Sequence, residues 1–297
     1  MADELPAAVS RLRAAGGFVL DMDGTLVLGD RRNHRLAPLP GALALTRRLR
    51  RGGVPFVVLT NGTTRTPPQY AATLRDIGFD LDADGVLTPV SSAIEVLRRR
   101  RQSRVMVLGT GGLTDPLEEA GVEVLPPSGR PRVDAVLVGW YREFTMDALE
   151  SACHAVWDGA PLYSCSQSVF FATADGRAMG TSRAISAMVR SLTGCRVQVV
   201  GKPSLHALRS AGRRLGVRLG ELAVVGDDPE LEVPMAHRGR SLAVAVGTGI
   251  GDGDAFAGQP EARRPHLSVP GVDALLALYE GAPDRSVRGR GPRLTGR

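Results

Sequence analysis

Close to its start the chain reads Phe18-Val19-Leu20-Asp21-Met22-Asp23-Gly24-Thr25-Leu26, an apolar run that stops at two carboxylates and a glycine. The run predicts a buried strand, after which Gly24 lets the backbone turn tightly. In an open α/β sheet, the carboxyl ends of the strands border the ligand crevice. We therefore expect Asp21 and Asp23 to face a substrate; the alternative is a plain strand followed by an Asp-Gly turn.

The length and composition of the chain are those of a globular protein. Its 297 residues suffice for one large domain or two modest ones. Because no run of about 18 apolar residues appears and the acidic N-terminus lacks a signal core, we expect no membrane partner and a cytoplasmic location. The three cysteines lack metal-ligand spacing, which predicts reduced and mostly buried thiols at Cys153, Cys165 and Cys195.

The net charge of +6 does not indicate a nucleic-acid partner. Much of the positive excess lies in residues 281–297, a Gly/Pro-rich basic segment that we expect to be a disordered tail. Aromatic side chains suited to stacking on bases are few and are not interleaved with the arginines. We therefore expect no nucleic-acid binding.

A single lysine stands among the cationic residues. Of the 37 Lys and Arg residues, 36 are Arg, and Lys202 alone carries an ammonium group. An ammonium is a compact charge with rotatable donors, whereas a guanidinium is a planar fork. Lys202 follows the apolar run at 197–200 and precedes Pro203, which suits the first position of a helix. We therefore expect the lysine at a strand-to-helix junction.

Apolar strand patterns alternate with helical patterns along the chain. Helical spacing occurs at residues 6–15, 40–51, 67–78, 87–101, 145–157, 182–192, 205–215 and 272–279. Nearly continuous apolar runs occur at residues 54–59, 105–108, 133–138, 197–200, 222–225 and 242–246. This order predicts parallel strands joined by right-handed crossovers, and hence an α/β fold. Residues 109–112, a glycine cluster without a dinucleotide fingerprint, are expected to form a tight turn.

Polar side chains follow four of the expected strands. They are Asp21 and Asp23, Thr60 and Asn61, Lys202, and Asp227 and Asp228. Carboxylates that face one crevice repel each other unless a hard cation joins them, and Mg²⁺ takes one or two carboxylates with water and phosphate oxygens. A lysine, a threonine hydroxyl and backbone N–H groups can hold the remaining phosphate oxygens. The set therefore predicts a phosphoryl-transfer site in which Asp21 and Asp227 hold Mg²⁺.

The order of these motifs resembles the haloacid dehalogenase (HAD) superfamily. The motifs are Asp-x-Asp-Gly-Thr-Leu at 21–26, Thr-Asn-Gly at 60–62, Gly-Lys-Pro-Ser at 201–204 and Gly-Asp-Asp at 226–228. The 140 positions from Gly62 to Lys202 exceed one crossover, which is similar to the NagD-like and p-nitrophenylphosphatase-like subfamily with an inserted cap. The resemblance implies a doubly wound, mostly parallel Rossmann-like core sheet from residues 1–86 and 197–280, with an α/β cap domain at 87–196.

The resemblance also implies roles for the two acids of the first motif. Asp21 is expected to be the nucleophile and a metal ligand. Asp23 is expected to be the general acid/base, with its backbone carbonyl on the metal. Because the dehalogenases themselves lack the second acid, Asp23 favours phosphate chemistry over carbon–halogen cleavage.

Phosphate and substrate contacts follow from the same resemblance. Thr60, the backbone of Asn61 and Lys202 are expected to hold the phosphate. In the cap, relatives commonly show a Thr-Asn-x-Asp turn where this chain has Cys-Ser-Gln-Ser at 165–168. We take Ser166 and Ser168 as the substrate-facing residues of that turn.

The last motif departs from the family pattern. Relatives usually carry a second Asp five residues after the first, and here that place is held by Glu232. We expect Asp227 and Asp228 to bind the metal, with Asp228 or Glu232 completing the ligand set.

Together these expectations describe a Mg²⁺-dependent phosphatase that hydrolyses a small phosphorylated metabolite through an aspartyl-phosphate on Asp21. Two alternatives remain open: a phosphotransferase that uses the same intermediate, and a non-catalytic phosphate-binding protein. Relatives often dimerise through such caps, so the resemblance also implies a homodimer.

Overall fold

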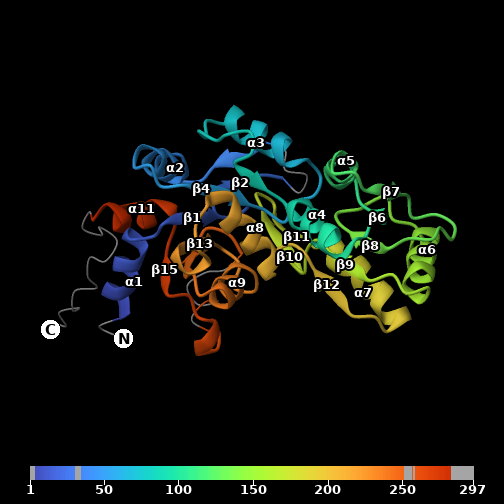
Figure 1. Cartoon of the computed structure of the whole chain (residues 1–297). Coiled ribbons are helices and arrows are strands. Elements are labelled where there is room, and N and C mark those ends of the chain that lie inside the picture. Colours follow the sequence, from blue (N-terminus) through green and yellow to red (C-terminus); the bar gives the residue numbers. More distant parts are fainter. Residues whose placement is uncertain (1–3, 31–34, 251–255, 257, 282–297) are drawn as a thin grey trace.

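The chain is arranged around two parallel sheets that lie at opposite ends of the molecule (Figure 1). The computed structural model describes residues 4–30, 35–250, 256 and 258–281. The expected disordered tail lies outside these residues, apart from Gly281. None of the helices that the structure describes combines the length and the apolar character of a bilayer-crossing segment.

The first sheet has six strands, all parallel. In spatial order they are β15 (Leu267–Val269), β14 (Leu242–Val246), β13 (Leu222–Gly226), β1 (Gly17–Leu20), β4 (Phe56–Leu59) and β5 (Val86–Leu87). The chain runs outward from β1 to β4 and β5, and later returns to build β13, β14 and β15 on the other side. The strand order therefore reverses between β1 and β13, which is where open α/β sheets bind ligands.

Helices cover both faces of the first sheet, so its central strands are buried on both sides. On one face pack α1 (Glu4–Arg13), α2 (Ala42–Arg51), α3 (Pro67–Asp76) and α11 (Val272–Glu280). On the other pack α8 (Leu205–Leu215) and α9 (Glu232–Gly239). Within β1, Phe18 and Leu20 face the first group of helices and Val19 faces the second. This alternation explains why the strand sequence is continuously apolar.

The second sheet has five parallel strands and its own helices. In spatial order the strands are β12 (Val197–Val199), β9 (Leu162–Ser164), β8 (Ala135–Val138), β6 (Arg104–Leu108) and β7 (Glu123–Leu125). On one face pack α4 (Pro89–Arg100) and α5 (Gly111–Glu119), and on the other α6 (Met146–Trp157) and α7 (Thr181–Thr193). The sheet matches the expected inserted cap, and α4 contacts α8 where the two halves meet.

One strand belongs to a different sheet than the sequence predicts. The pattern places residues 197–200 in the core, but β12 pairs with β9, with Val197 opposite Leu162. The second sheet therefore extends past the expected boundary at residue 196. The physical reason is that β12 is a half-buried edge strand of three residues, whose valines suit either sheet.

In the described residues, two antiparallel hairpins and two short 3₁₀ helices accompany these sheets. The hairpins are β2 (Val27–Leu28) with β3 (Ala37–Pro38), and β10 (Phe170–Thr173) with β11 (Gly176–Met179). The 3₁₀ helices are η1 (Leu219–Glu221) and η2 (Glu261–Arg263). At the tip of the second hairpin, the Ala174 N–H donates to the Gly29 carbonyl at 2.8 Å. This hairpin therefore reaches from the cap to the core.

The predicted α/β class with a doubly wound core sheet and a separate cap is confirmed. The expectation for the thiols also holds, since Cys153 and Cys165 are buried, Cys195 is half-buried and all three are free. The glycine cluster at 109–112 differs from expectation, because Gly111 is the first residue of α5 rather than part of a tight turn.

His266 joins the edge strand β15 to its neighbour. Its ring Nδ1 accepts the Ala243 N–H at 2.9 Å, and its ring lies 4.8 Å from that of His237, centroid to centroid. An imidazole nitrogen that accepts a hydrogen bond carries no proton. Burial, followed by the charges of His237 and Arg11, lowers the pKa of His266 to about 4.

We expect the free energy of unfolding to fall by about 1–2 kcal/mol as the pH drops from 6.5 to 4, after allowance for solvent screening. Over this range the unfolded state binds a proton at His266 and the folded state does not, so stability rises with pH. Urea unfolding at several pH values should show a shallower slope for His266→Asn, whose side-chain oxygen can still accept the Ala243 N–H. Equal slopes in the two proteins would contradict this assignment.

Candidate active site

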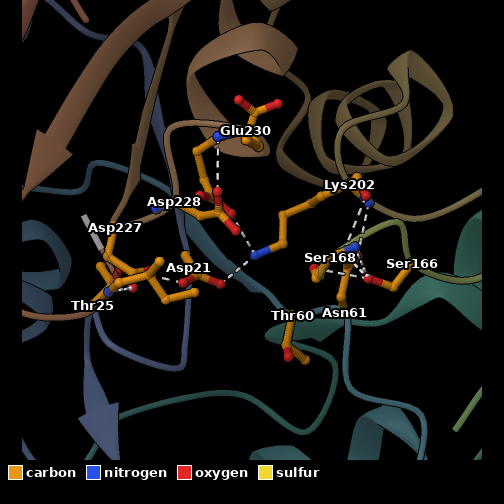
Figure 2. A network of polar contacts seen from close by, with 12 residues as sticks. Asp21, Thr25, Thr60, Asn61, Ser166, Ser168, Lys202, Asp227, Asp228 and Glu230 are labelled. Carbon is orange, nitrogen blue, oxygen red and sulfur yellow. Dashed lines mark hydrogen bonds and ion pairs between the residues drawn. The ribbon is translucent and has the colours of Figure 1, made fainter. Parts of the chain in front are cut away.

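The expected polar residues meet at the carboxyl ends of the strands (Figure 2). Asp21 and Asp23 follow β1, Thr60 and Asn61 follow β4, and Asp227 and Asp228 follow β13. Lys202 lies between β12 and α8, so it comes from the segment that joins the two sheets. All seven line one pocket, together with Ser166 and Ser168 from the loop after β9. The structure therefore brings together every site residue that the sequence predicts.

Asp21 and Lys202 form the centre of the site. The Lys202 ammonium group is in direct contact with the Asp21 carboxylate (Figure 2). It also pairs with the Glu232 carboxylate, with 2.7 Å between nitrogen and oxygen. The second oxygen of Asp21 accepts the Thr25 hydroxyl at 3.3 Å. Asp21 is 6 % exposed and Lys202 is 3 % exposed, so both are held in place yet reach the pocket.

The buried lysine keeps its charge because of these two acids. Burial alone would lower the pKa of Lys202, but the charges of Asp21 and Glu232 outweigh it and raise the pKa. Burial raises the pKa of Glu232 to about 8, against the opposing effect of Lys202. Glu232 also accepts the Asp228 N–H at 3.2 Å. The glutamate at this position therefore holds the lysine and the backbone of the last motif.

The surroundings of Asp23 raise the pKa of its carboxyl group. Burial, and next the charge of Asp21, raise the pKa of Asp23 to about 7, while Lys202 and a hydrogen bond with Thr60 act in the opposite direction. The Thr60 hydroxyl also accepts the Gly62 N–H at 2.9 Å. One oxygen of Asp23, Oδ1, is buried without a hydrogen-bond partner. A carboxyl group with a pKa near 7 can both give and take a proton at neutral pH.

Asp227 lies in a close-fitting cradle. Its Oδ2 accepts the Ile250 N–H at 2.7 Å, and a Cβ at Gly24 or at Gly249 would collide with its carboxylate. Gly24 has a φ of +83°, which also favours glycine. Burial, followed by the charges of Asp21 and Glu232, raises the pKa of Asp227 well above its usual value.

Asp228, next in the chain, also faces the pocket. Burial raises its pKa to about 6, and its Oδ1 accepts the Glu230 N–H at 2.8 Å. This bond closes the turn that leads into α9, where Glu232 is the first residue. The two acids named as alternatives for the ligand set therefore have different surroundings, since Glu232 is paired with Lys202 and Asp228 is not.

The cap and the core meet through the side chain of Asn61. Its Oδ1 accepts the backbone N–H of Lys202 at 2.8 Å. Its Nδ2 donates to the backbone carbonyl of Lys202 and to the Ser166 hydroxyl, each at 3.1 Å. The Ser166 and Ser168 hydroxyls are 2.9 Å apart. Asn61 thus positions the lysine and links it to the cap loop, a role beyond the backbone contact that the sequence predicts.

The site suits a small hard cation. Buried carboxylates that raise each other's pKa, together with the unpartnered Oδ1 of Asp23, form an environment that a bound Mg²⁺ would stabilise. In the described part of the chain, no group of three His, Cys, Asp or Glu side chains could hold a metal by itself. That agrees with Mg²⁺, which binds one or two carboxylates and takes its other oxygens from water and substrate.

Sequence reasoning missed several other residues that line the pocket. Trp140 follows β8, Phe171 lies in β10, and Thr63 and Tyr70 come from the core. The Thr63 hydroxyl accepts the backbone N–H of Trp140 at 2.8 Å. A signal existed for Trp140, since it follows an apolar strand run just as Asp21 and Thr60 do. The contact of Thr63 with the cap had no counterpart in the sequence pattern.

Comparison with known families and proteins agrees with this geometry. Residues 18–123 match the family described as haloacid dehalogenase-like hydrolase, and residues 199–275 match a second family of HAD-like hydrolases. The gap between the two matches, residues 124–198, contains most of the second sheet.

Several relatives and solved structures are similar over most of their length. Mouse chronophin is 30% identical over 283 residues, covering 92% of this chain and 95% of chronophin. A 5′-nucleotidase of Bacillus subtilis is 29% identical over 215 residues, 71% of this chain and 79% of the relative. The structure of a 4-nitrophenylphosphatase from Thermotoga maritima superposes with a TM-score of 0.79 at 25% identity, covering 89% of this chain and 97% of that one. A glycerol phosphate phosphatase from Mycobacterium tuberculosis in complex with magnesium has the same fold. Its TM-score is 0.78 at 24% identity, and the match covers 88% of this chain and 76% of that one.

Proposed function

Because the chain belongs to the haloacid dehalogenase-like hydrolases, we propose that it is a Mg²⁺-dependent phosphatase that hydrolyses a small phosphorylated metabolite. The observation that carries the proposal is the contact between the Asp21 carboxylate and the buried Lys202 ammonium group, with Asp23 two residues away. A nucleophile, a fixed cation and an acid of suitable pKa then face one pocket.

In the first step, an oxygen of Asp21 attacks the phosphorus atom and the bond from phosphorus to the leaving oxygen breaks. The protonated carboxyl group of Asp23 gives its proton to that leaving oxygen, so an alcohol departs. Lys202 and the Thr60 hydroxyl hold phosphate oxygens and offset the negative charge on them. The product is an aspartyl-phosphate on Asp21.

In the second step, Asp23 takes a proton from water, and the resulting hydroxide attacks the phosphorus atom. The bond from phosphorus to Asp21 breaks, which releases inorganic phosphate and restores the free carboxylate. Asp23 is again protonated, so the enzyme returns to its starting state. The pKa of about 7 suits both transfers.

We assign the metal to the carboxylates of Asp21 and Asp227 and the backbone carbonyl of Asp23, with Asp228 beside them in the pocket. Bound there, Mg²⁺ would neutralise carboxylate and phosphate charge and orient the phosphoryl group. Glu232 is left to hold Lys202 and the last motif, because one of its oxygens pairs with the ammonium group at 2.7 Å and the other accepts the Asp228 N–H at 3.2 Å. The cap, which Asn61 and Thr63 tie to the core, excludes water during the first step.

The test is phosphate release from a panel of phosphorylated metabolites, measured with Mg²⁺ and with EDTA. We expect release from at least one compound, at least tenfold slower in EDTA and restored by added Mg²⁺. Analysis of products in the presence of an alcohol acceptor separates hydrolysis from phosphotransfer. Binding of phosphate without any turnover would replace the proposal with a non-catalytic phosphate-binding protein.

A further inference from the structure

The pocket above the catalytic residues has two chemically different halves. Its empty space, including the open mouth, is about 780 Å³. All the charged side chains among its described lining residues are at the catalytic end: Asp21, Asp23, Lys202, Asp227, Asp228 and Glu232. The rest of the described lining is uncharged: apart from the amide of Asn61 it is apolar, aromatic or hydroxyl-bearing, with Trp140 after β8 and Phe170 and Phe171 in the hairpin.

Trp140 is held in place from two sides. Its backbone N–H, not the indole N–H, donates to the Thr63 hydroxyl of the core at 2.8 Å, which fixes the chain beside the ring. Its ring packs edge-to-face against Phe171, with centroids 5.7 Å apart and an angle of 70° between the planes. Phe171 lies in the hairpin whose tip donates from Ala174 to Gly29 of the core. An aromatic wall fixed in this way costs little conformational entropy when a flat group binds against it.

We propose that the leaving group of the substrate is uncharged and presents a flat apolar face, and that Trp140 is the residue that selects it. This inference rests on the proposed function for its reaction, but it concerns the half of the pocket that takes no part in the chemistry. A charged leaving group would lose water without gaining an ion-pair partner among the described lining residues. A planar apolar group gains contact with Trp140 and Phe171 instead.

Three arginines lie near aromatic side chains of the pocket without lining it. Arg65 lies on the catalytic side, with its guanidinium carbon 5.8 Å from the Tyr70 ring centroid, and Arg142 and Arg177 lie near the wall. The guanidinium carbon of Arg142 is 5.9 Å from the Trp140 ring centroid, and that of Arg177 is 4.3 Å from the Phe170 ring centroid. Both side chains are exposed, and each already stacks on an aromatic ring. A substrate with an anionic leaving group would have to draw one of them away, so an anionic analogue is a direct test of the proposal.

The experiment compares benzyl phosphate with glycerol 3-phosphate, because both release a primary alcohol, one with a flat apolar face and the other aliphatic with two further hydroxyl groups. For the natural chain we expect kcat/KM to be at least about tenfold higher for benzyl phosphate. Trp140→Ala should raise KM for benzyl phosphate about tenfold, change kcat less than about threefold and leave glycerol 3-phosphate nearly unaffected. Trp140→Phe should retain most of the preference. The matched control is Trp157→Ala, which replaces an exposed tryptophan on α6 and should leave kcat/KM unchanged for both substrates.

The outcomes separate the inference from the proposed function. Turnover of both substrates with equal kcat/KM, unaltered in Trp140→Ala, overturns the inference and leaves the phosphatase in place. A kcat/KM at least tenfold higher for 4-carboxybenzyl phosphate than for benzyl phosphate also overturns it, since an anionic group is then preferred. If nothing is hydrolysed, binding of benzylphosphonate that is measurable by calorimetry and lost in Trp140→Ala supports the inference while the proposed function fails; no such binding overturns both.

Discussion

Asp21→Asn is expected to reduce phosphate release by about 10⁴-fold or more, with little change in the fold. An amide of the same shape keeps the hydrogen bond from Thr25, but it cannot attack phosphorus as a carboxylate does. Lys202 retains Glu232 as a buried partner, so the variant leaves no cation unpaired. Circular dichroism and urea unfolding should therefore show a folded protein.

The measurement is kcat/KM for the best substrate of the panel, together with mass spectrometry of acid-quenched protein. The natural chain should carry a phosphoryl group on the peptide that contains Asp21, and the variant should not. Asp147→Asn, an exposed residue in the first turn of α6, is the matched control and should keep full activity. An active Asp21→Asn protein would remove Asp21 as the nucleophile and with it the proposed mechanism.

The part of the site that sequence reasoning predicted is the part that a parallel sheet assembles by itself. β1, β4 and β13 are buried on both faces, so their sequences are continuously apolar and their ends are easily located. Once the strands are parallel, Asp21, Thr60 and Asp227 must lie at the same edge. Their meeting at one edge is therefore predictable without knowledge of the contacts, whereas their roles were implied by the resemblance to the HAD superfamily.

The elements that escaped prediction lack such a pattern. α9 contains Pro234, which looks like a helix breaker but lies in the first turn, where a missing N–H is tolerated. β5 and β15 are two and three residues long, too short for a periodic signal. The sheet to which β12 belongs depends on its partner β9, and the roles of Thr63 and Trp140 depend on contacts between the core and the cap. These are tertiary facts that no local pattern contains.

Lys202→Met is the second variant for which we expect a large effect, on stability as well as on activity. Removing the ammonium group leaves Asp21 and Glu232 buried near each other without the cation that pairs with both. Breaking a buried ion pair in this way costs about 3–5 kcal/mol of unfolding free energy. Loss of the phosphate-holding charge should also lower kcat/KM by about 10²–10³-fold.

A double variant separates these two effects. In Lys202→Met/Glu232→Gln the acid that is most deeply buried beside the lysine is neutral, so we expect most of the lost unfolding free energy to return. Activity should stay low, because nothing replaces the ammonium group at the phosphate. Glu232→Gln alone is the control, and it should remain folded and keep Lys202 paired with Asp21. Recovery of activity in the double variant would mean that Lys202 serves only to neutralise Glu232, since in that case the charge of the lysine would not be needed by the reaction.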